Sequence, residues 1–174
     1  MIRKDFVSNS SSCSFIINNP KSMAQKESIN YLLKIMSYIP CDRKISCDNG
    51  CIDFNLNEKK FTDIVRSVNT LPETSKLKNN IELSDSCANI RNTDIFEDTS
   101  TLSDVEKEII LTLFENSDSV AFDFGLDDCG NKLQDASALL MALCLKYDID
   151  SCDSEENDFD DIVRMAVEFK KSLE

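Results

Sequence analysis

The sequence predicts a single α+β domain over residues 1–174, in which one mixed or antiparallel sheet carries about five helices. Short segments that alternate apolar and polar residues predict strands, and longer segments with apolar residues at helical spacing predict helices. A chain of 174 residues, of which 41% are hydrophobic, can bury a substantial core in one domain. Three glycines and three prolines are too few for a many-turned sandwich, barrel or repeat array.

The first nineteen residues predict a β-hairpin. Two apolar runs, Ile2–Val7 and Ser14–Asn18, flank a serine-rich loop and contain the β-branched residues that favour strands. A helix is expected to follow, because Ser22 and Gln25 have the spacing of a capping box. Its apolar stripe consists of Ile29, Leu32, Leu33 and Met36.

The next segment predicts a second hairpin and a second helix. Cys51–Leu56 alternates as a half-buried strand should, and the turn Asp48-Asn49-Gly50 joins it to Lys44–Cys47. Asn57 is a good cap for the helix, which ends at Leu71-Pro72. Its apolar stripe consists of Phe61, Ile64, Val65 and Val68.

The polar stretch over residues 73–100 predicts a long irregular excursion or a mobile surface segment, with one short strand at Asn80–Ser84. Regular structure returns at Ser103, which forms a capping box with Glu106. This capping box begins a helix that is expected to bury Leu102, Val105, Ile109 and Leu113. The strand Ser119–Phe124 is expected to follow this helix.

Two helices are expected at the end of the chain. Asn131 is the expected cap of Lys132–Tyr147, whose middle is apolar all round and is therefore expected to be buried. The last helix begins near Glu155. Acids fill its first turns and Lys170-Lys171 its last, which suits the helix dipole.

Charge is distributed unevenly along the chain. Residues 1–87 carry 12 Lys and Arg against 10 Asp and Glu, whereas residues 88–174 carry 7 against 22, so net charges of +2 and −15 make up the total of −13. The basic residues are scattered. We therefore expect no nucleic-acid binding, which needs a phosphate-neutralising face, and expect instead a protein partner with a basic surface.

The chain contains eight cysteines and no histidine. The missing histidine excludes Ser-His-Asp and Cys-His catalysis and any histidine metal ligand. The sequence shows no secretory signal, so the cysteines are expected to be reduced thiols in a cytoplasmic protein. Cys41, Cys47 and Cys51, with Cys87 as a distant fourth ligand, fit zinc spacing poorly. We expect no cofactor and no membrane association.

Three aspartates are weak candidates for a metal site. Asp53 and Asp123 each interrupt an apolar strand, and Asp127 follows closely. If the two strands are neighbours, the three carboxylates can gather at a sheet edge and hold Mg²⁺. The simpler interpretation, which we favour, is that Asp53 and Asp123 point to the solvated face, as strand alternation requires.

The serine-rich loop is the candidate binding site. Its hydroxyls and backbone amides can cradle a phosphate or another anion. The alternative, which we favour, is that the hydroxyls satisfy backbone groups of the loop itself. The candidate residues are Ser8, Asn9, Ser10, Ser11, Ser12 and Ser14.

The same segment carries a resemblance. Phe6–Phe15 reads FVSNSSSCSF, which resembles the opening FVSNSSSSSF of many small bacterial and bacteriophage proteins of unknown function, with Cys13 where serine is usual. Those proteins differ widely downstream. The resemblance therefore implies a shared lineage or N-terminal role, and a bacterial or phage origin, without implying an activity.

These observations predict a non-enzymatic, cytoplasmic accessory protein that acts through protein contacts of its acidic second half. One alternative is a phage inhibitor of host defence that mimics the charge of nucleic acid. Another is a metal-dependent enzyme or nucleotide binder that uses Asp53, Asp123, Asp127 and the serine loop. Carboxylates that converge in a cleft would favour the enzyme, and carboxylates dispersed over a surface would favour the binding protein.

Overall fold

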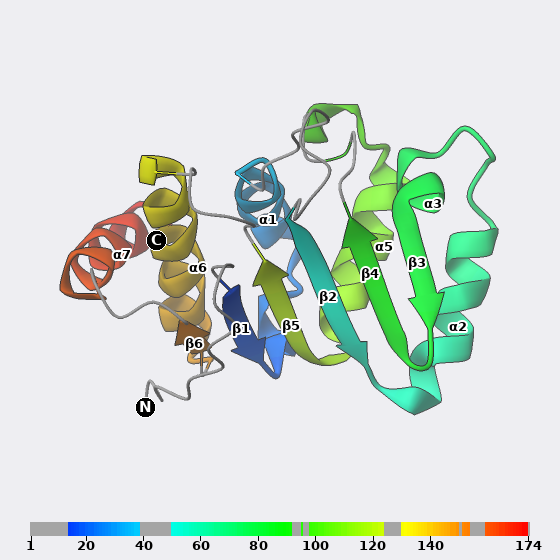
Figure 1. The fold of residues 1–174 in the computed structure, drawn as a ribbon, viewed down its shortest axis with the longest axis horizontal. Coiled ribbons are helices and arrows are strands. Elements are labelled where there is room, and N and C mark those ends of the chain that lie inside the picture. Colours follow the sequence, from blue (N-terminus) through cyan, green and yellow to red (C-terminus); the bar gives the residue numbers. More distant parts are fainter. Residues whose placement is uncertain are drawn as a thin grey trace.

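The computed structural model describes residues 14–38, 50–91, 95, 98–123, 130–149, 151–153 and 159–173. Within these residues, six α-helices and a six-stranded sheet form one α+β domain (Figure 1). Every described strand pair is antiparallel. The predicted fold class is therefore confirmed, and of the two sheet types expected from the sequence it is the antiparallel one that forms.

The strands follow the order β3-β4-β2-β5-β1-β6 across the sheet. Their bounds are β1 Ser14–Asn18, β2 Cys51–Leu56, β3 Ile81–Ser84, β4 Cys87–Arg91, β5 Ser117–Asp123 and β6 Ser151–Asp153. β5 is central and pairs with β1 on one edge and β2 on the other. Apart from β3 and β4, which are consecutive, neighbours in the sheet come from distant parts of the chain.

The strands predicted at Ser14–Asn18 and Cys51–Leu56 are confirmed, but their partners differ from the predicted hairpins. β1 pairs with β5 and with β6, and β2 pairs with β4 and with β5. The predicted partners Ile2–Val7 and Lys44–Cys47 lie outside the described residues. Both edges of β1 and both edges of β2 are occupied by strands from other parts of the chain.

The helices lie in two groups. Their bounds are α1 Ile29–Met36, α2 Glu58–Asn69, α3 Lys76–Asn80, α5 Asp104–Glu115, α6 Gly130–Tyr147 and α7 Phe159–Leu173, with 3₁₀ turns η1 Pro20–Met23, η2 Lys26–Ser28 and η3 Thr99–Thr101. In Figure 1, α2 and α5 lie behind the sheet. α6 and α7 pack against each other at the end formed by β1 and β6 (Figure 1).

Capping residues determine where two helices begin. The side chain of Asn57 accepts a hydrogen bond from the backbone N–H of Lys59 at 3.1 Å, as expected. The predicted capping box of Ser103 and Glu106 is also present. The capping box predicted at Ser22 and Gln25 is wrong, because the chain there makes two 3₁₀ turns and α1 begins only at Ile29.

The core lies on one face of the sheet. Alternate residues of the four central strands are at most 1% exposed: Phe15, Ile17, Ile52, Phe54, Ala88, Ile90, Val120 and Phe122. Phe114 of α5 packs on this layer, with its ring centroid 5.2 Å from that of Phe54 and 6.1 Å from that of Phe122. The edge-to-face arrangement of the first pair is the geometry that aromatic rings prefer.

α6 confirms the expectation of a buried helix. Every residue from Ala136 to Cys144 is buried, whereas Leu145 is 38% exposed. The helix begins at Gly130, so Asn131 lies inside it and is not its cap. Although α6 is apolar, no helix of the described residues is long and apolar enough to cross a membrane.

The stretch predicted as irregular over residues 73–100 is largely ordered, and this prediction is wrong. It contains α3, the predicted short strand β3, and the additional strand β4. Asp85 and Ser86, which join β3 to β4, have φ values of 47° and 65°. Positive φ at both central residues is the geometry of a tight type I′ hairpin turn, in which asparagine and glycine are the usual residues.

Glu106 joins this stretch to α5. Its Oε1 atom accepts hydrogen bonds from Ser75 Oγ at 2.6 Å and from the backbone N–H of Leu77 at 3.1 Å. Its Oε2 atom accepts from the backbone N–H and from Oγ of Ser103, both at 2.7 Å. The carboxylate is 5% exposed, whereas Val105 is 59% exposed. The predicted burial of Val105 is therefore wrong, because these bonds turn the adjacent Glu106 inward.

Replacing Leu140 with aspartate should unfold the domain. Leu140 is fully buried in α6, so the new carboxylate would be buried and unpaired, at a cost of several kcal/mol. Leu145→Asp, on the exposed side of the same helix, is the control and should change stability little. Urea denaturation measures both. Equal urea midpoints for the two variants would show that the packing of α6 differs from that described.

Replacing Glu106 with glutamine should destabilise the protein by about 2 kcal/mol or more, because a neutral amide cannot accept all four hydrogen bonds. Burial by itself raises the pKa of the Glu106 carboxyl. The hydrogen bonds from Ser75, Ser103 and Leu77 have the larger combined effect, so the pKa is lowered from 4.5 to about 2. The folded state therefore binds the proton less tightly than the unfolded state. The stabilisation is present above about pH 4.5 and is lost as pH falls towards 2.

Urea midpoints of wild type and Glu106→Gln at neutral pH and at several acid pH values measure this dependence. The difference between the two proteins should shrink through that acid window. Glu108→Gln, an exposed position on the same helix, is the control and should match wild type throughout. A pH-independent difference for Glu106→Gln would mean that the carboxylate charge contributes nothing.

Candidate functional site

The fold brings together several residues that the sequence singles out. β2 and β5 are neighbours, and Asp123 pairs in register with Cys51 on one side and with Ser14 on the other. Asp53 lies two residues from Cys51 along β2, so its side chain is on the same face as that of Cys51. Asp127 and the serine-loop residues Ser8, Asn9, Ser10, Ser11 and Ser12 lie outside the described residues.

Asp53 and Asp123 point to the face opposite the core, as expected from alternation. Asp53 is exposed and Asp123 half-buried. They belong to a polar group that we call the outer-face cluster: Cys51, Asp53, Asn89, Arg91 and Asp123, contributed by β2, β4 and β5. Antiparallel register places Asn89 opposite Asp53, and Arg91 opposite Cys51. In Figure 1 this part of the sheet lies in front of α5.

A chain of hydrogen bonds connects the outer-face cluster. Nε of Arg91 donates to Oδ1 of Asn89 at 2.7 Å. Nδ2 of Asn89 donates to Oδ1 of Asp53, and Sγ of Cys51 donates to Oδ2 of Asp53 at 3.4 Å. Both carboxylate oxygens of Asp53 are therefore engaged, and Asn89, only 8% exposed, is satisfied on both sides of its amide.

The electrostatics of the outer-face cluster keep the thiol neutral. The pKa of the Cys51 thiol is raised from 9.0 to about 12. Burial is the largest cause, followed by the Asp53 charge, the hydrogen bond to Asp53 and the Asp123 charge, and the hydrogen bond to Asn89 opposes them. A thiolate is the form that attacks electrophiles and binds metals. Cys51 is therefore a hydrogen-bond donor at neutral pH and a poor nucleophile.

The described residues provide no ligand set for a metal ion. No group of three or more Cys, Asp or Glu side chains among them is arranged to hold one. Cys87 pairs with Asn55, four residues from Cys51 along β2. At about 3.3 Å per residue, these two thiols are about 13 Å apart and cannot share a zinc ion. Asp53 is exposed and Asp123 is half-buried on the face of the sheet opposite the core.

Asn89 and Arg91 are the members of the outer-face cluster that sequence reasoning missed. They lie in β4, within the stretch predicted to be irregular. A signal was present, because Ala88 and Ile90 alternate with Cys87, Asn89 and Arg91 at the period of a strand. The run of five residues is short and follows two residues that need positive φ, which conceals it among turn residues.

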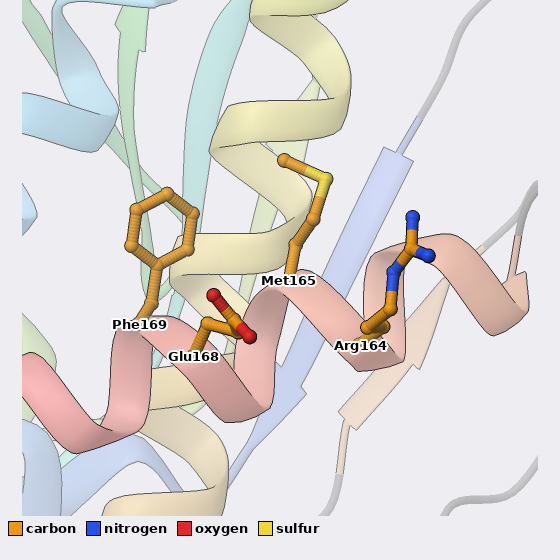
Figure 2. Close-up of a pocket in the computed structure, with 4 residues that line it drawn as sticks. All are labelled: Arg164, Met165, Glu168 and Phe169. Carbon is orange, nitrogen blue, oxygen red and sulfur yellow. The ribbon is translucent and has the colours of Figure 1, made fainter.

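An open hollow of about 690 Å³ lies along α7, lined by Arg164, Met165, Glu168 and Phe169. Figure 2 shows these four side chains projecting from the same side of the helix, with α6 behind them. An aromatic ring and a thioether beside one guanidinium and one carboxylate make the hollow amphipathic. Of the predicted site residues whose side chains the structure describes, Asp53 and Asp123, neither lines it.

Comparison with known proteins returned no match. No family model matches the chain, and no curated protein and no solved structure is significantly similar to it. The resemblance of Phe6–Phe15 to the serine motif remains a prediction, and the function must be argued from the chain itself.

Cys51 should react slowly with iodoacetamide at neutral pH, because only its thiolate reacts and its pKa is about 12. The exposed Cys87 is an internal reference that should react faster. Asp53→Asn removes the adjacent charge and should speed alkylation of Cys51 by about tenfold. Mass spectrometry of the modified peptides measures both rates.

Asp63→Asn, which neutralises an exposed carboxylate on α2, is the matched control for this experiment and should leave the Cys51 rate unchanged. A wild-type Cys51 that reacts as fast as Cys87 would contradict the described environment of the thiol.

Proposed function

We propose that this protein is a non-enzymatic accessory protein of a bacterium or phage, and that it binds a partner with a basic surface through one acidic face of α5. This acidic face consists of Asp104, Glu108 and Glu115. Residues four and seven positions apart lie on the same side of a helix, so the three carboxylates form a line. This line of charge is the observation that carries the proposal.

The acidic face is open to solvent and is weakly neutralised. All three side chains are exposed, and that of Asp104 completely so. The basic residue of α5 is Lys107, whose side chain is 30% exposed and whose Nζ lies 3.7 Å from a carboxylate oxygen of Asp104. Exposed pairs of this kind contribute little. Val105, which is 59% exposed beside Asp104, adds an apolar contact surface.

The neighbouring helix provides a contrast. α2 packs beside α5 and exposes basic residues together with acids, so its charges nearly cancel. Its exposed charged residues are Glu58, Lys59, Lys60, Asp63 and Arg66. The negative potential on this side of the domain is therefore concentrated on α5. Such a field attracts basic surfaces and speeds their encounter.

The arrangement of Asp53 and Asp123 favours this proposal over a metal-dependent enzyme. Both oxygens of Asp53 are engaged, by Asn89 and by Cys51. Enzyme sites place reactive carboxylates in concave, water-excluding pockets. Among the residues that the structure describes, neither Asp53 nor Asp123 lines the hollow along α7.

The test is to recover the partner with an affinity-tagged full chain from cells of its source organism. The charge variant is Asp104→Asn/Glu108→Gln, and the matched control is Glu58→Gln/Asp63→Asn on α2. Each variant removes one first-turn acid and one acid in the helix interior, and each breaks one i,i+3 ion pair. Both variants therefore remove two negative charges.

Wild type and the α2 control should recover the same basic protein, and the α5 variant should recover at least about tenfold less of it. Recovery should fall as salt rises, because exposed charges are screened. Equal recovery by both variants would rule out the acidic face as the contact surface. If recovery did not change with salt, the negative charge of α5 would contribute to solubility and not to partner binding, which would contradict the proposal.

A further inference from the structure

A second hollow lies where η1 meets the C-terminal end of α5. It has a volume of about 570 Å³ and is lined by Asn19, Lys21, Ser22, Ala24, Gln25 and Glu115. Pockets that hold small molecules measure about 300–1,000 Å³, and the volume of this hollow lies within that range. The wall is mostly polar and combines one cation, one anion and three neutral hydrogen-bonding side chains.

One side of this hollow is strongly negative. Glu115 is the last residue of α5, whose final turn contains no basic residue. The C-terminal end of a helix already carries partial negative charge, so a carboxylate there is unfavourable unless a cation neutralises it. Asp118, exposed three residues later, adds to the field. A positively charged group placed beside Glu115 would be stabilised by all three sources.

The η1 side of the hollow presents Lys21. Lys21 and Glu115 are both exposed, and neither is among the described residues that form an ion pair. Two side chains of opposite charge therefore line the same hollow without forming an ion pair. A simple anion would be repelled by Glu115 and a simple cation by Lys21, whereas a molecule that carries both charges would satisfy both sides.

Hydrogen bonds hold two of the polar residues that line the hollow, Asn19 and Gln25. Asn19 has a left-handed backbone, with φ of 50°, and its N–H donates to the carbonyl of Asp118 at 2.8 Å, which ties η1 to the strand after α5. Nε2 of Gln25 donates to the carbonyl of Ser22 at 3.4 Å. The amide oxygen of Gln25 therefore remains on the wall as an acceptor.

We propose that this hollow binds a free α-amino acid with a small or polar side chain, its ammonium group towards Glu115 and its carboxylate towards Lys21. The two charges of the ligand match the two unpaired charges of the hollow, and the polar wall suits a polar side chain. A polypeptide terminus is a poorer match, because it presents only one of the two charges at its end. The inference does not depend on the proposed partner.

The experiment titrates the full chain with serine and glutamine by calorimetry and by NMR. Glycinamide, which lacks the carboxylate, and N-acetylglycine, which lacks the ammonium group, are the matched probes. The variants are Lys21→Ala and Glu115→Gln, with Lys26→Ala and Glu82→Gln as controls at exposed positions outside the hollow. All four positions are exposed, so the variants should fold as wild type does.

Serine or glutamine should bind at least about tenfold more tightly than either single-charge probe. Lys21→Ala and Glu115→Gln should each weaken binding by about tenfold or more, and both controls should match wild type. The charge-swapped variant Lys21→Glu/Glu115→Lys should restore part of the affinity. Absence of binding by either amino acid, equal binding of glycinamide, or unchanged binding by both hollow variants would overturn the proposal.

Partner recovery with the Asp104→Asn/Glu108→Gln variant leaves this hollow intact. The proposed function and the amino-acid site can therefore fail separately, and each experiment reports on only one of them.

Discussion

The structure depends on β5 being paired along both edges. This strand joins β1, from the beginning of the described chain, to β2, which itself joins β4 and β3. Without β5 the sheet would separate into the pair β1–β6 and the three strands β2, β4 and β3. Its inward side chains, Val120 and Phe122, are fully buried, so the same seven residues also form the centre of the core.

This central strand also determines what the two faces of the sheet can do. One face must be apolar because α5 and its neighbours cover it, and Phe114 packs directly on the strands there. The other face can then carry polar residues, provided that the buried ones are paired. Asn89 meets this condition by bonding to Asp53 and Arg91. The buried polar side chain on this face is thus satisfied by its neighbours in the sheet.

Much of the local structure follows from short patterns in the sequence. Alternation located β1, β2, β3 and β5, and the caps at Asn57 and Ser103 located two helix starts, because these signals act between residues a few positions apart. The predictions are wrong where contacts with a distant segment of the chain determine which side chains are buried. Val105 looks like a core residue on a helical wheel, yet Glu106 is buried instead, because Ser75 and Leu77 donate hydrogen bonds to it from a segment thirty residues away.

The candidate sites divide in the same way. The sequence by itself determined that Asp53 and Asp123 interrupt strands and that negative charge is concentrated in the second half, since both follow from residue order and composition. Only the tertiary structure decided that β2 and β5 are neighbours, that Asn89 and Arg91 join Asp53, and that Lys21 and Glu115 face one hollow. The physical reason is that strand pairing and helix packing are chosen by competition among distant apolar surfaces, and no local pattern records the outcome.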